Sequence, residues 1–290
     1  MAETPDRSVF YDELLTSYGE TLTARPHAMG FFDWFQKQGA DALASGRHDA
    51  DLLFRRVGIT FNVYGDQEGA ERLIPFDLIP RILTAAEWWT LERGLAQRVN
   101  ALNAFLQDIY HEQRIIAEKI VPADLIHQNP QYRPELHGVK LPHDVWAHIS
   151  GIDIVRAEKG EFYVLEDNLR VPSGVSYMIE DRKVMMRLFP EIFASNSVAP
   201  VEHYPDLLLE HLRSIAPVGV ENPTVVVLTP GMYNSAYFEH AYLAQQMGVE
   251  LVEGRDLFVS EERVFAKTTR GPRRIDVIYR RIDDDFLDPL

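Results

Sequence analysis

The sequence predicts a mixed α/β (α+β) protein, and three patterns carry this prediction. Residues 223–254 have the order apolar strand, amphipathic helix, apolar strand, which is typical of a parallel βαβ unit. Residues 147–169 contain two strand-like runs on either side of a short turn, which favours an antiparallel hairpin. From Ala85 to about Lys119, apolar residues recur at helical spacing. The chain therefore combines helices with strands of both orientations.

The first part of the chain has weaker patterns. Residues 1–30 look irregular, and residues 31–50 indicate a short helix that ends near Gly46. Residues 56–64 alternate apolar and polar side chains and stop at the turn signal Tyr64-Gly65-Asp66. We therefore expect one short helix and one strand before the central region.

The central helix has a well-marked start. Thr84 is a candidate N-cap, and Glu87 stands at the spacing of a capping box. We interpret the segment that follows as a packed scaffold helix. Residues 122–142 are rich in Pro, His and Asn and should form a loop, whereas residues 177–195 should be helical.

A change of character near Pro200 and Pro205 suggests a boundary. Beyond it lies the βαβ pattern of residues 223–254, whose helix is closed by Gly248. Residues 263–269 and 274–281 predict two more strands. The C-terminal part should therefore contain a Rossmann-like parallel sheet.

Composition restricts the class of function. The 290 residues carry a formal net charge of −15, which disfavours nucleic acid and anionic membrane surfaces as partners. The chain has no cysteine, so disulfides and thiolate chemistry are excluded. It also has no signal-peptide pattern and no apolar run near the roughly 20 residues of a membrane span. We therefore expect a cytoplasmic protein with small-molecule partners.

The hairpin of residues 147–169 carries the most informative polar residues. Glu166 and Asn168 are two apart on the second strand and so project from the same face, while Asp167 points the other way. The pairing of the strands can bring Asp153 opposite them. Three hard oxygen ligands without sulfur or imidazole suit Mg²⁺ or Mn²⁺.

A solvated polar face or a simple turn is the plainer interpretation of these residues. Two observations favour a metal site instead. The acidic residues interrupt an apolar strand that we expect to be buried, and buried charges need partners or metals. The strand also continues into Arg170 and the Pro172-Ser173-Gly174 loop, which could hold phosphate oxygens.

Longer runs around this hairpin resemble a known family. The run YVLEDNLRVPSGVSYMIEDR is similar to the E-x-N segment of ATP-grasp enzymes in its circularly permuted version. The runs TPGMYNSAYFEHAYLAQQMGVELVEGRDL, YRRIDDDFLDP and RRVGITFNVYGD extend the resemblance to roughly residues 50–290. The family resembled is a bacterial group related to glutathionylspermidine synthase.

The resemblance implies an ATP- and Mg²⁺-dependent carboxylate–amine ligase. In such enzymes ATP phosphorylates a carboxylate, an amine attacks the acyl phosphate, and ADP and phosphate leave. Matched to the motif, the implied Mg²⁺ ligands, for one or two ions, are Asp153, Glu166 and Asn168. The candidates for catalytic phosphate contacts are Arg170 and Arg182. The candidates for cofactor binding are Ser173, Gly174 and Ser176.

The sequence departs from the family pattern in two places. The family has an arginine two residues before the metal aspartate, where this chain has Gly151, and Arg170 is our candidate to supply that cation. The nucleotide-binding lysines of the family follow in a further stretch of chain, so we expect that C-terminal portion to be missing beyond Leu290. The resemblance implies three segments, namely an N-terminal lead (1–50), an ATP-grasp-type region with the metal-binding hairpin (51–200) and a Rossmann-like pre-ATP-grasp segment (201–290).

The start of the last predicted helix is a candidate substrate site. Asn234 and Ser235 follow a strand and a Pro-Gly turn, and helix N-termini bind anions such as a substrate carboxylate. An ordinary N-cap is the alternative. Glu239 and His240 come next and could lie on the surface. The charged cluster at 280–285 is either an ion-pair network or an acidic lip for a substrate amine.

Two functions from different classes remain open. The first is the ligase, acting on a small-molecule carboxylate and an amine or peptide. The second is a catalytically incomplete fragment that serves as a ligand-binding or interaction module. The oligomeric state stays open in both.

Overall fold

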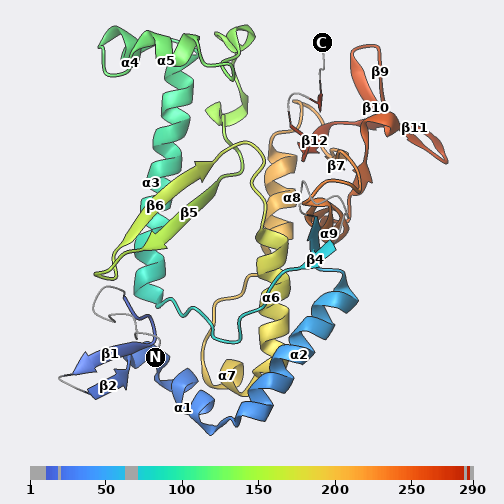
Figure 1. The fold of residues 1–290 in the computed structure, drawn as a ribbon. Helices are drawn as coiled ribbons and strands as arrows, with labels where there is room; N and C mark the ends of the chain where they lie inside the picture. Colours follow the sequence, from blue (N-terminus) through green and yellow to red (C-terminus); the bar gives the residue numbers. More distant parts are fainter. Residues whose placement is uncertain (1–10, 19–20, 63–70, 284–285, 288–290) are drawn as a thin grey trace. The chain divides into compact units, whose positions relative to one another are not determined.

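The computed structural model describes residues 11–18, 21–62, 71–283 and 286–287 (Figure 1). The chain forms two compact units, and each is considered by itself. The hairpin unit comprises Leu83–Pro172 together with the chain up to Tyr11. The βαβ unit comprises Asp12–Ile82 and Ser173–Leu290. The division into segments 1–50, 51–200 and 201–290 stays a prediction.

The hairpin unit is built on the long helix α3, Ala85–Ile109. Its predicted capping box is present. The Glu87 backbone N–H donates to Thr84 Oγ1 at 3.2 Å, and the Thr84 N–H donates to Glu87 Oε2 at 2.8 Å. These bonds satisfy two of the backbone donors that a helix start leaves without partners.

The helix ends earlier than the predicted Lys119. Gln113 has a left-handed backbone with φ of 55°, and it separates α3 from the short helix α4, Arg114–Ala117. The Asp108 carboxylate accepts from the backbone N–H groups of Arg114 and Ile115, at 3.0 and 2.9 Å. The apolar spacing in the sequence continues past this break because Ile115 and Ile116 of α4 pack against the same apolar cluster as Ile109 at the end of α3.

The rest of the hairpin unit is a helical cap and the predicted hairpin. The predicted loop of residues 122–142 contains two short helices, α5 (Ala123–His127) and η2 (Pro134–Leu136), and a third, η3 (Pro142–Asp144), begins at its last residue. The antiparallel hairpin is confirmed as β5 (Gly151–Arg156) and β6 (Phe162–Asn168). Figure 1 shows this hairpin lying along α3.

The N-terminal part of the βαβ unit differs from the sequence prediction. Residues predicted to be irregular contain a small antiparallel pair and the short helix η1, whereas the helix predicted for residues 31–50 begins with α1 and is interrupted before α2 at Gln38 and Gly39. The elements are β1 (Leu15–Tyr18), β2 (Thr21–Ala24), η1 (Pro26–Ala28) and α1 (Met29–Lys37). The predicted stop at Gly46 is wrong, because α2 runs from Ala40 to Val57 and ends at Gly58, whose φ is 78°.

That longer helix shortens the strand predicted for residues 56–64. Among the described residues of that segment, only Thr60–Asn62 form a strand, β3, which pairs antiparallel with β4, Glu71–Leu73. Residues 63–64 and the predicted turn through Asp66 lie outside the described residues. The alternating pattern near residue 56 belongs to the last turn of α2 instead.

The predicted βαβ unit is confirmed. Strand β7 (Val225–Leu228) leads through α9 (Tyr237–Met247) to β8 (Glu250–Val252), and the two strands are parallel. The sheet order is β12-β7-β8, so β7 is central. All four residues of β7 are buried, which explains its continuous apolar run.

The strand predicted for residues 274–281 is two strands in different sheets. They are β11 (Gly271–Ile275) and β12 (Val277–Arg280), which flank Asp276. Strand β11 belongs to an antiparallel sheet of order β11-β10-β9, with β9 at Leu257–Ser260 and β10 at Arg263–Thr268. The short helix η4 (Gly254–Asp256) leads into that sheet.

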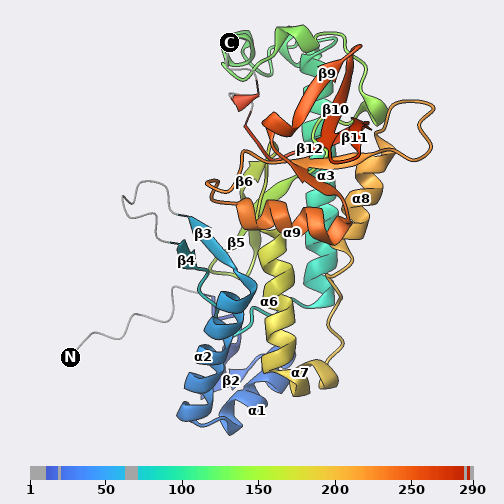
Figure 2. The same ribbon diagram turned by 90° about the vertical axis from the view of Figure 1, so that its right-hand side faces the viewer.

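Helices cover the rest of this unit. The helix predicted for residues 177–195 is split at Phe189 and Pro190, because proline favours a new helix start. The helices are α6 (Val175–Leu188), α7 (Pro190–Ser195) and α8 (Tyr204–Ser214). Figure 2 shows α2 and α6 side by side, where Phe54 and Val184 share an apolar cluster.

Two apolar clusters hold the βαβ unit together. The first joins α2, α6 and the segments beside them, and consists of Ala50, Phe54, Ile59, Phe76, Val184 and Phe189. The second joins the parallel and antiparallel sheets, and consists of Val226, Leu228, Val252, Ala266 and Ile275. Among the described residues, no helix has both the length and the apolar character needed to cross a membrane.

Candidate functional site

The hairpin places the three predicted metal ligands on one face. Asp153 on β5 stands directly opposite Glu166 on β6, and Gly151 stands opposite Asn168. The register shifts between Asp153 and Ile154, which leaves Leu165 as an extra residue in a β-bulge. The Asn168 amide Nδ2 donates to Glu166 Oε1 at 3.1 Å. The pairing geometry is the one that the sequence spacing predicts.

This face of the hairpin is exposed, which corrects one step of the sequence reasoning. Asp153, Glu166 and Asn168 all lie on the solvent-exposed side, so they do not interrupt a buried strand. The apolar residues of the hairpin that face inward are Ile152, Ile154, Phe162 and Val164. Burial of charge therefore does not favour a metal at this site. What favours a cation is that two carboxylates, Asp153 and Glu166, stand opposite each other across the strands.

On the opposite face of the hairpin, the Asp167 carboxylate forms an ion pair with α3. It accepts two bonds from Arg98 on α3, with Nη2 2.6 Å from Oδ2 and Nε 2.7 Å from Oδ1. This hydrogen bonding to the guanidinium lowers the pKa of Asp167 below its ordinary value. Arg156 binds Glu87 at 2.7 Å on the same side. These two ion pairs fix the hairpin on α3 and leave its other face available.

The donor set on the exposed face fits a hard cation. Two opposed carboxylates and one amide are the ligands that Mg²⁺ takes when substrate phosphates and water complete its shell. Like charges directly opposite each other on a sheet are unfavourable unless something offsets them. Among the residues that the structure describes, no group of three or more His, Cys, Asp or Glu side chains could hold a metal ion. The residues that would hold a cation here are Asp153, Glu166 and Asn168, with water or substrate phosphates completing its shell.

Gly151 explains one departure from the family pattern. A Cβ built on Gly151 would lie 2.6 Å from Pro172 Cβ, closer than real side chains approach. An arginine at this position would therefore displace the chain at Pro172. Arg170, predicted to replace that arginine, donates from Nη1 to Gln131 Oε1 at 3.3 Å in the helical cap.

Arg182 lies on α6 in the βαβ unit. Its Nη1 donates to the backbone carbonyl of Ala199 at 2.7 Å, and its guanidinium lies 5.8 Å from the ring centre of Phe193. These contacts tie α6 to the segment that leads into α8. The structure thus assigns Arg182 a packing contact, and its predicted phosphate contact remains a prediction.

The predicted cofactor loop already binds a carboxylate of the chain itself. Glu239 Oε2 accepts from the Gly174 N–H at 2.7 Å, from the Ser176 N–H at 3.1 Å and from Ser176 Oγ at 2.9 Å. Its Oε1 accepts from Arg281 Nη2 at 3.0 Å. Ser173, in contrast, has an exposed side chain. The N-terminal end of α6 therefore binds a carboxylate of the chain itself, and the predicted binding of phosphate oxygens by this loop remains a prediction.

The predicted substrate residues lie in the turn between β7 and α9. Asn234 Oδ1 accepts from the Ala236 N–H at 2.9 Å, and Ser235 is half-buried beside it. Helix α9 begins at Tyr237, so Asn234 shapes the turn ahead of the helix. This is close to the ordinary capping role that was the alternative to substrate binding.

Behind this turn, His240 shares a hydrogen bond of 2.9 Å between its Nδ1 and Thr229 Oγ1. Thr229 Oγ1 also accepts from the Gly231 N–H at 3.2 Å. Burial, and secondarily the charge of Arg281, lower the pKa of His240 to about 3. The imidazole is therefore neutral at physiological pH.

The roles of Glu239, His240 and Arg281 were not predicted from the sequence. A surface position was considered for Glu239 and His240, yet their exposed fractions are 0% and 1%. Arg281 is 3% exposed. Of the two interpretations of the charged cluster at 280–285, the ion pair applies to this residue, because Arg281 binds Glu239. Residues 284–285 of that cluster lie outside the described residues. The available signal was that α9 follows a fully apolar strand, which requires the helix to be buried on its sheet side.

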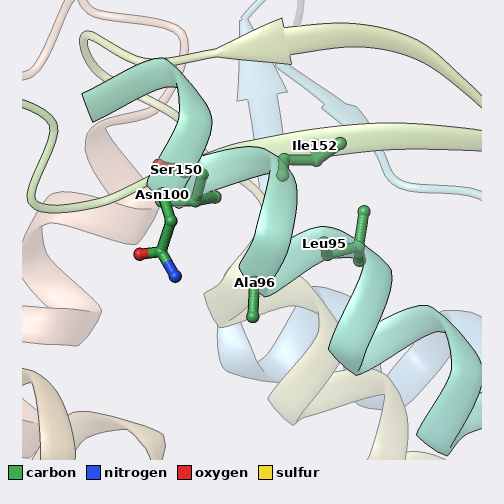
Figure 3. Close-up of a pocket in the computed structure, with 6 residues that line it drawn as sticks. Leu95, Ala96, Asn100, Ser150 and Ile152 are labelled. Atoms are coloured by element: carbon green, nitrogen blue, oxygen red, sulfur yellow. The ribbon is translucent and has the colours of Figure 1, made fainter. Parts of the chain in front are cut away.

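A shallow hollow of about 410 Å³ lies between α3 and β5 in the hairpin unit (Figure 3). Its lining consists of Leu95, Ala96, Val99, Asn100, Ser150 and Ile152. Ile152 pairs with Asp167, so this hollow is on the opposite face of the hairpin from Asp153. It contains none of the predicted site residues.

Comparisons with known proteins agree with the fold and the motifs. An uncharacterised protein of Synechocystis sp. is 49% identical over 284 residues, which cover 98% of this chain and 58% of that protein. A putative glutamate–cysteine ligase of Frankia alni is 42% identical over 282 residues, covering 96% of this chain and 32% of the relative. The chain spans about half the length, or less, of such curated relatives.

A solved structure and a family model complete the comparison. The glutathione synthetase-like effector from Globodera pallida, in its apo form, matches 86% of this chain and 59% of its own with a TM-score of 0.53. At 10% sequence identity this likeness shows the fold alone. A family model described as a circularly permuted ATP-grasp matches residues 80–290, which include the hairpin, the loop of residues 173–176 and the βαβ unit. The chain therefore belongs to the circularly permuted ATP-grasp family.

Proposed function

We propose that this chain supplies the metal-binding part of an ATP- and Mg²⁺-dependent carboxylate–amine ligase. The observation that carries the proposal is the exposed pair Asp153 and Glu166, directly opposed on β5 and β6 with Asn168 bonded to Glu166. Membership of the ATP-grasp family supports the choice of ATP as the co-substrate. Amide or peptide bond formation is the reaction proposed.

The reaction proceeds in two balanced steps. A substrate carboxylate oxygen attacks the γ-phosphorus of ATP, the bond to the β-phosphate oxygen breaks, and ADP leaves with an acyl phosphate remaining. The nitrogen of an amine then attacks the acyl carbon, the amide forms, and inorganic phosphate and the amine proton are released. Such chemistry depends on positioning and on charge neutralisation more than on covalent catalysis by the protein.

The residues of the hairpin would hold the cation. Asp153 and Glu166 supply carboxylate oxygens and Asn168 a neutral one, and one or two Mg²⁺ ions are proposed. The bound cation would offset the negative charge of the nucleotide phosphates. In its absence, the two carboxylates repel each other across the strands, so the protein bears a small stability penalty at this pair.

The other predicted residues keep narrower proposed roles. Arg170 and Arg182 are proposed to contact phosphate oxygens, and each would first release the amide or carbonyl oxygen that it now binds. Ser173 is exposed and can reach a ligand, whereas the donors of Gly174 and Ser176 are engaged by Glu239 and shape the nucleotide loop. Asn234 and Ser235 are proposed to face the substrate carboxylate.

The substrates are proposed to be a small-molecule carboxylate and an amine or peptide. The name of the Frankia alni relative, a putative glutamate–cysteine ligase, is compatible with an amino-acid substrate. A net charge of −15 favours a cationic amine over polyanionic partners such as nucleic acid. A cytoplasmic location, where ATP and Mg²⁺ are abundant, is part of the proposal.

A second candidate is a ligand-binding or interaction module without ligase activity of its own. The observation in its favour is that the donors of Gly174 and Ser176, in the predicted cofactor loop, are already engaged by Glu239 of the chain itself. The two candidates differ in one measurable property, because only the first requires the chain to bind MgATP.

The test is calorimetric titration of Mg²⁺, Mn²⁺ and ATP, separately and together, into the chain and into Glu166→Gln. Glu158→Gln is the matched control, because it removes the same charge from the exposed turn of the same hairpin. We expect the affinity for the metal nucleotide to fall about tenfold or more in Glu166→Gln and to stay unchanged in the control.

Equal affinity in both variants would refute the metal assignment. Failure of the unmodified chain to bind MgATP would instead favour the second candidate. Binding of ATP that is independent of the metal would support a nucleotide site elsewhere on the chain and not at the hairpin.

A further inference from the structure

Two adjacent buried polar residues at the start of α9 are not explained by the proposed chemistry. Glu239 and His240 are 0% and 1% exposed, on a helix whose neighbouring positions are otherwise apolar or aromatic. Adjacent helix residues point about 100° apart, so the pair can reach two different segments. We refer to Glu239 and His240 together as the α9 anchor.

Glu239 binds two segments that are far away in the sequence. Three donors come from the loop of residues 173–176, namely the N–H of Gly174 and the N–H and hydroxyl of Ser176. The fourth comes from Arg281, directly after β12. Four hydrogen bonds satisfy the carboxylate, and Arg281 also binds the Tyr279 hydroxyl at 3.2 Å.

Gly174 adapts the loop to this carboxylate. Gly174 directly precedes α6. Its φ is 123°, a backbone conformation that residues other than glycine rarely adopt. The conformation turns the Gly174 N–H toward Glu239. Loop conformation and carboxylate position therefore depend on each other.

His240 holds a third segment, the turn of residues 229–235. Its Nδ1 shares a hydrogen bond with Thr229 Oγ1, which in turn accepts from the N–H of Gly231. Gly231 belongs to the turn that carries Asn234 and Ser235, and the Gly231 carbonyl accepts from the Asn234 N–H at 3.1 Å. The turn after β7 is thus attached to α9 through Thr229.

A contribution to folding stability does not by itself explain the buried ion pair between Glu239 and Arg281. A buried ion pair loses much of its attraction to desolvation, and well-packed apolar residues of similar volume are often as stable or more so. The hydrogen bonds of the α9 anchor are directional, however, and they fix the positions of three segments, namely residues 173–176, residues 229–235 and Arg281. Apolar packing would fix those positions less precisely.

We propose that Glu239 and His240 are positioning residues, which hold the loop of residues 173–176 and the turn of residues 229–235 at a fixed separation on α9. These are the segments that carry the proposed nucleotide and substrate contacts, and only the identity of those ligands rests on the proposed function. The α9 anchor itself contacts neither ligand. Each residue acts through the loop that it holds.

The test separates positioning from stability. The double variant Glu239→Leu with Arg281→Met replaces the ion pair by apolar side chains, and Glu239→Gln keeps the size of the side chain but not its charge. Hydrogen exchange at the Gly174 and Ser176 amides reports the loop, and chemical denaturation reports stability. We expect exchange at both amides to be about tenfold or more faster in both variants, even where the double variant is as stable as the parent.

His240→Asn supplies a rescue control, because its amide oxygen can take the place of Nδ1. It should preserve the exchange rate at Gly231, whereas His240→Leu should raise it without changing Gly174. Parental exchange at Gly174 and Ser176 in a stable double variant would overturn the proposal. These readouts need no ligand, so failure of the proposed ligase to bind ATP would leave this test intact.

In a chain that does bind MgATP, positioning predicts a specific pattern. The affinity for MgATP should fall in the stable double variant, whereas the affinity of the hairpin for Mn²⁺ alone should stay at the parental value. A parental affinity for MgATP together with fast exchange at Gly174 would also contradict the proposed role.

Discussion

The two polar groups described above use the same residue types in opposite ways. On the hairpin, Asp153 and Glu166 are exposed and face each other as like charges. On α9, Glu239 is fully buried and accepts four hydrogen bonds, one of them from Arg281. Glu239 is thus partnered by the chain itself, whereas Asp153 and Glu166 face each other, and we propose that a cation offsets their charge. The predictions below test this contrast.

The largest effect is expected from Glu239→Ala. It leaves the Arg281 charge buried without its carboxylate, and breaking a buried pair in this way costs about 3–5 kcal/mol of unfolding free energy. The control is Glu250→Ala, which removes the exposed ion pair between Glu250 and Arg273 and should cost less than about 1 kcal/mol. Urea denaturation of both variants measures the difference, and equal losses would show that burial does not separate the two kinds of pair.

The second effect is a pH dependence that comes from His240. Because its pKa in the folded protein is about 3, below its ordinary value of 6.5, the unfolded state binds the extra proton between these values. The contribution is therefore fully present above about pH 6.5 and is lost as the pH falls toward 3, by up to about 1.4 kcal/mol per pH unit. His240→Asn should flatten this part of the stability profile, and the exposed His203→Asn should not. An unchanged profile in His240→Asn would rule out the buried imidazole as its source.

A smaller effect of opposite sign is expected from Asp181 on α6. Burial, and then the neighbouring Glu180, raise its pKa to about 6. The charged form is disfavoured in the folded state, so stability is lost as the pH rises through 6. Asp181→Asn should stabilise the protein at pH 8 by on the order of 1 kcal/mol, after allowance for partial exposure, and have little effect near pH 4. Thermal unfolding at the two pH values checks this, and stabilisation that is equal at both would point to packing instead.

The smallest effect is expected from Asp153→Asn. Removal of one of two opposed carboxylates should raise the unfolding free energy by about 0.2–1 kcal/mol in the absence of metal. Added Mg²⁺ should then stabilise the parent but not the variant, because ligands stabilise the state to which they bind. Melting curves with and without Mg²⁺ give both numbers. A variant that is less stable than the parent without metal would mean that Asp153 has a structural partner.

The fold could be predicted where a local pattern is sufficient. Thr84 and Glu87 mark a helix start by themselves, and the all-apolar run of β7 requires burial on both faces. The predicted element boundaries were wrong where tertiary contacts determine the start or end of a helix or strand. Gly46 did not end α2, because packing of the helix against α6 offsets the modest helix-breaking tendency of glycine. Asp276 divides a single apolar run between two sheets, and no local pattern specifies that.

The same limit applies to the candidate site. The two-residue spacing of Glu166 and Asn168 and the short turn were enough to predict their common face and the partner Asp153. The contacts of Glu239, in contrast, join residues 65 and 42 positions apart in the chain. Such contacts follow from the tertiary arrangement of α6, α9 and β12, which a single sequence does not contain.

The contact between Gly151 and Pro172 has an evolutionary consequence. Since any side chain at position 151 would collide with the proline ring, the two positions are not free to change one at a time. A lineage that carries arginine at position 151 should therefore also carry a different residue, or a shifted backbone, at position 172. Substitutions at the two positions should then appear as a correlated pair, and a swap of both together should be tolerated where either one alone is not.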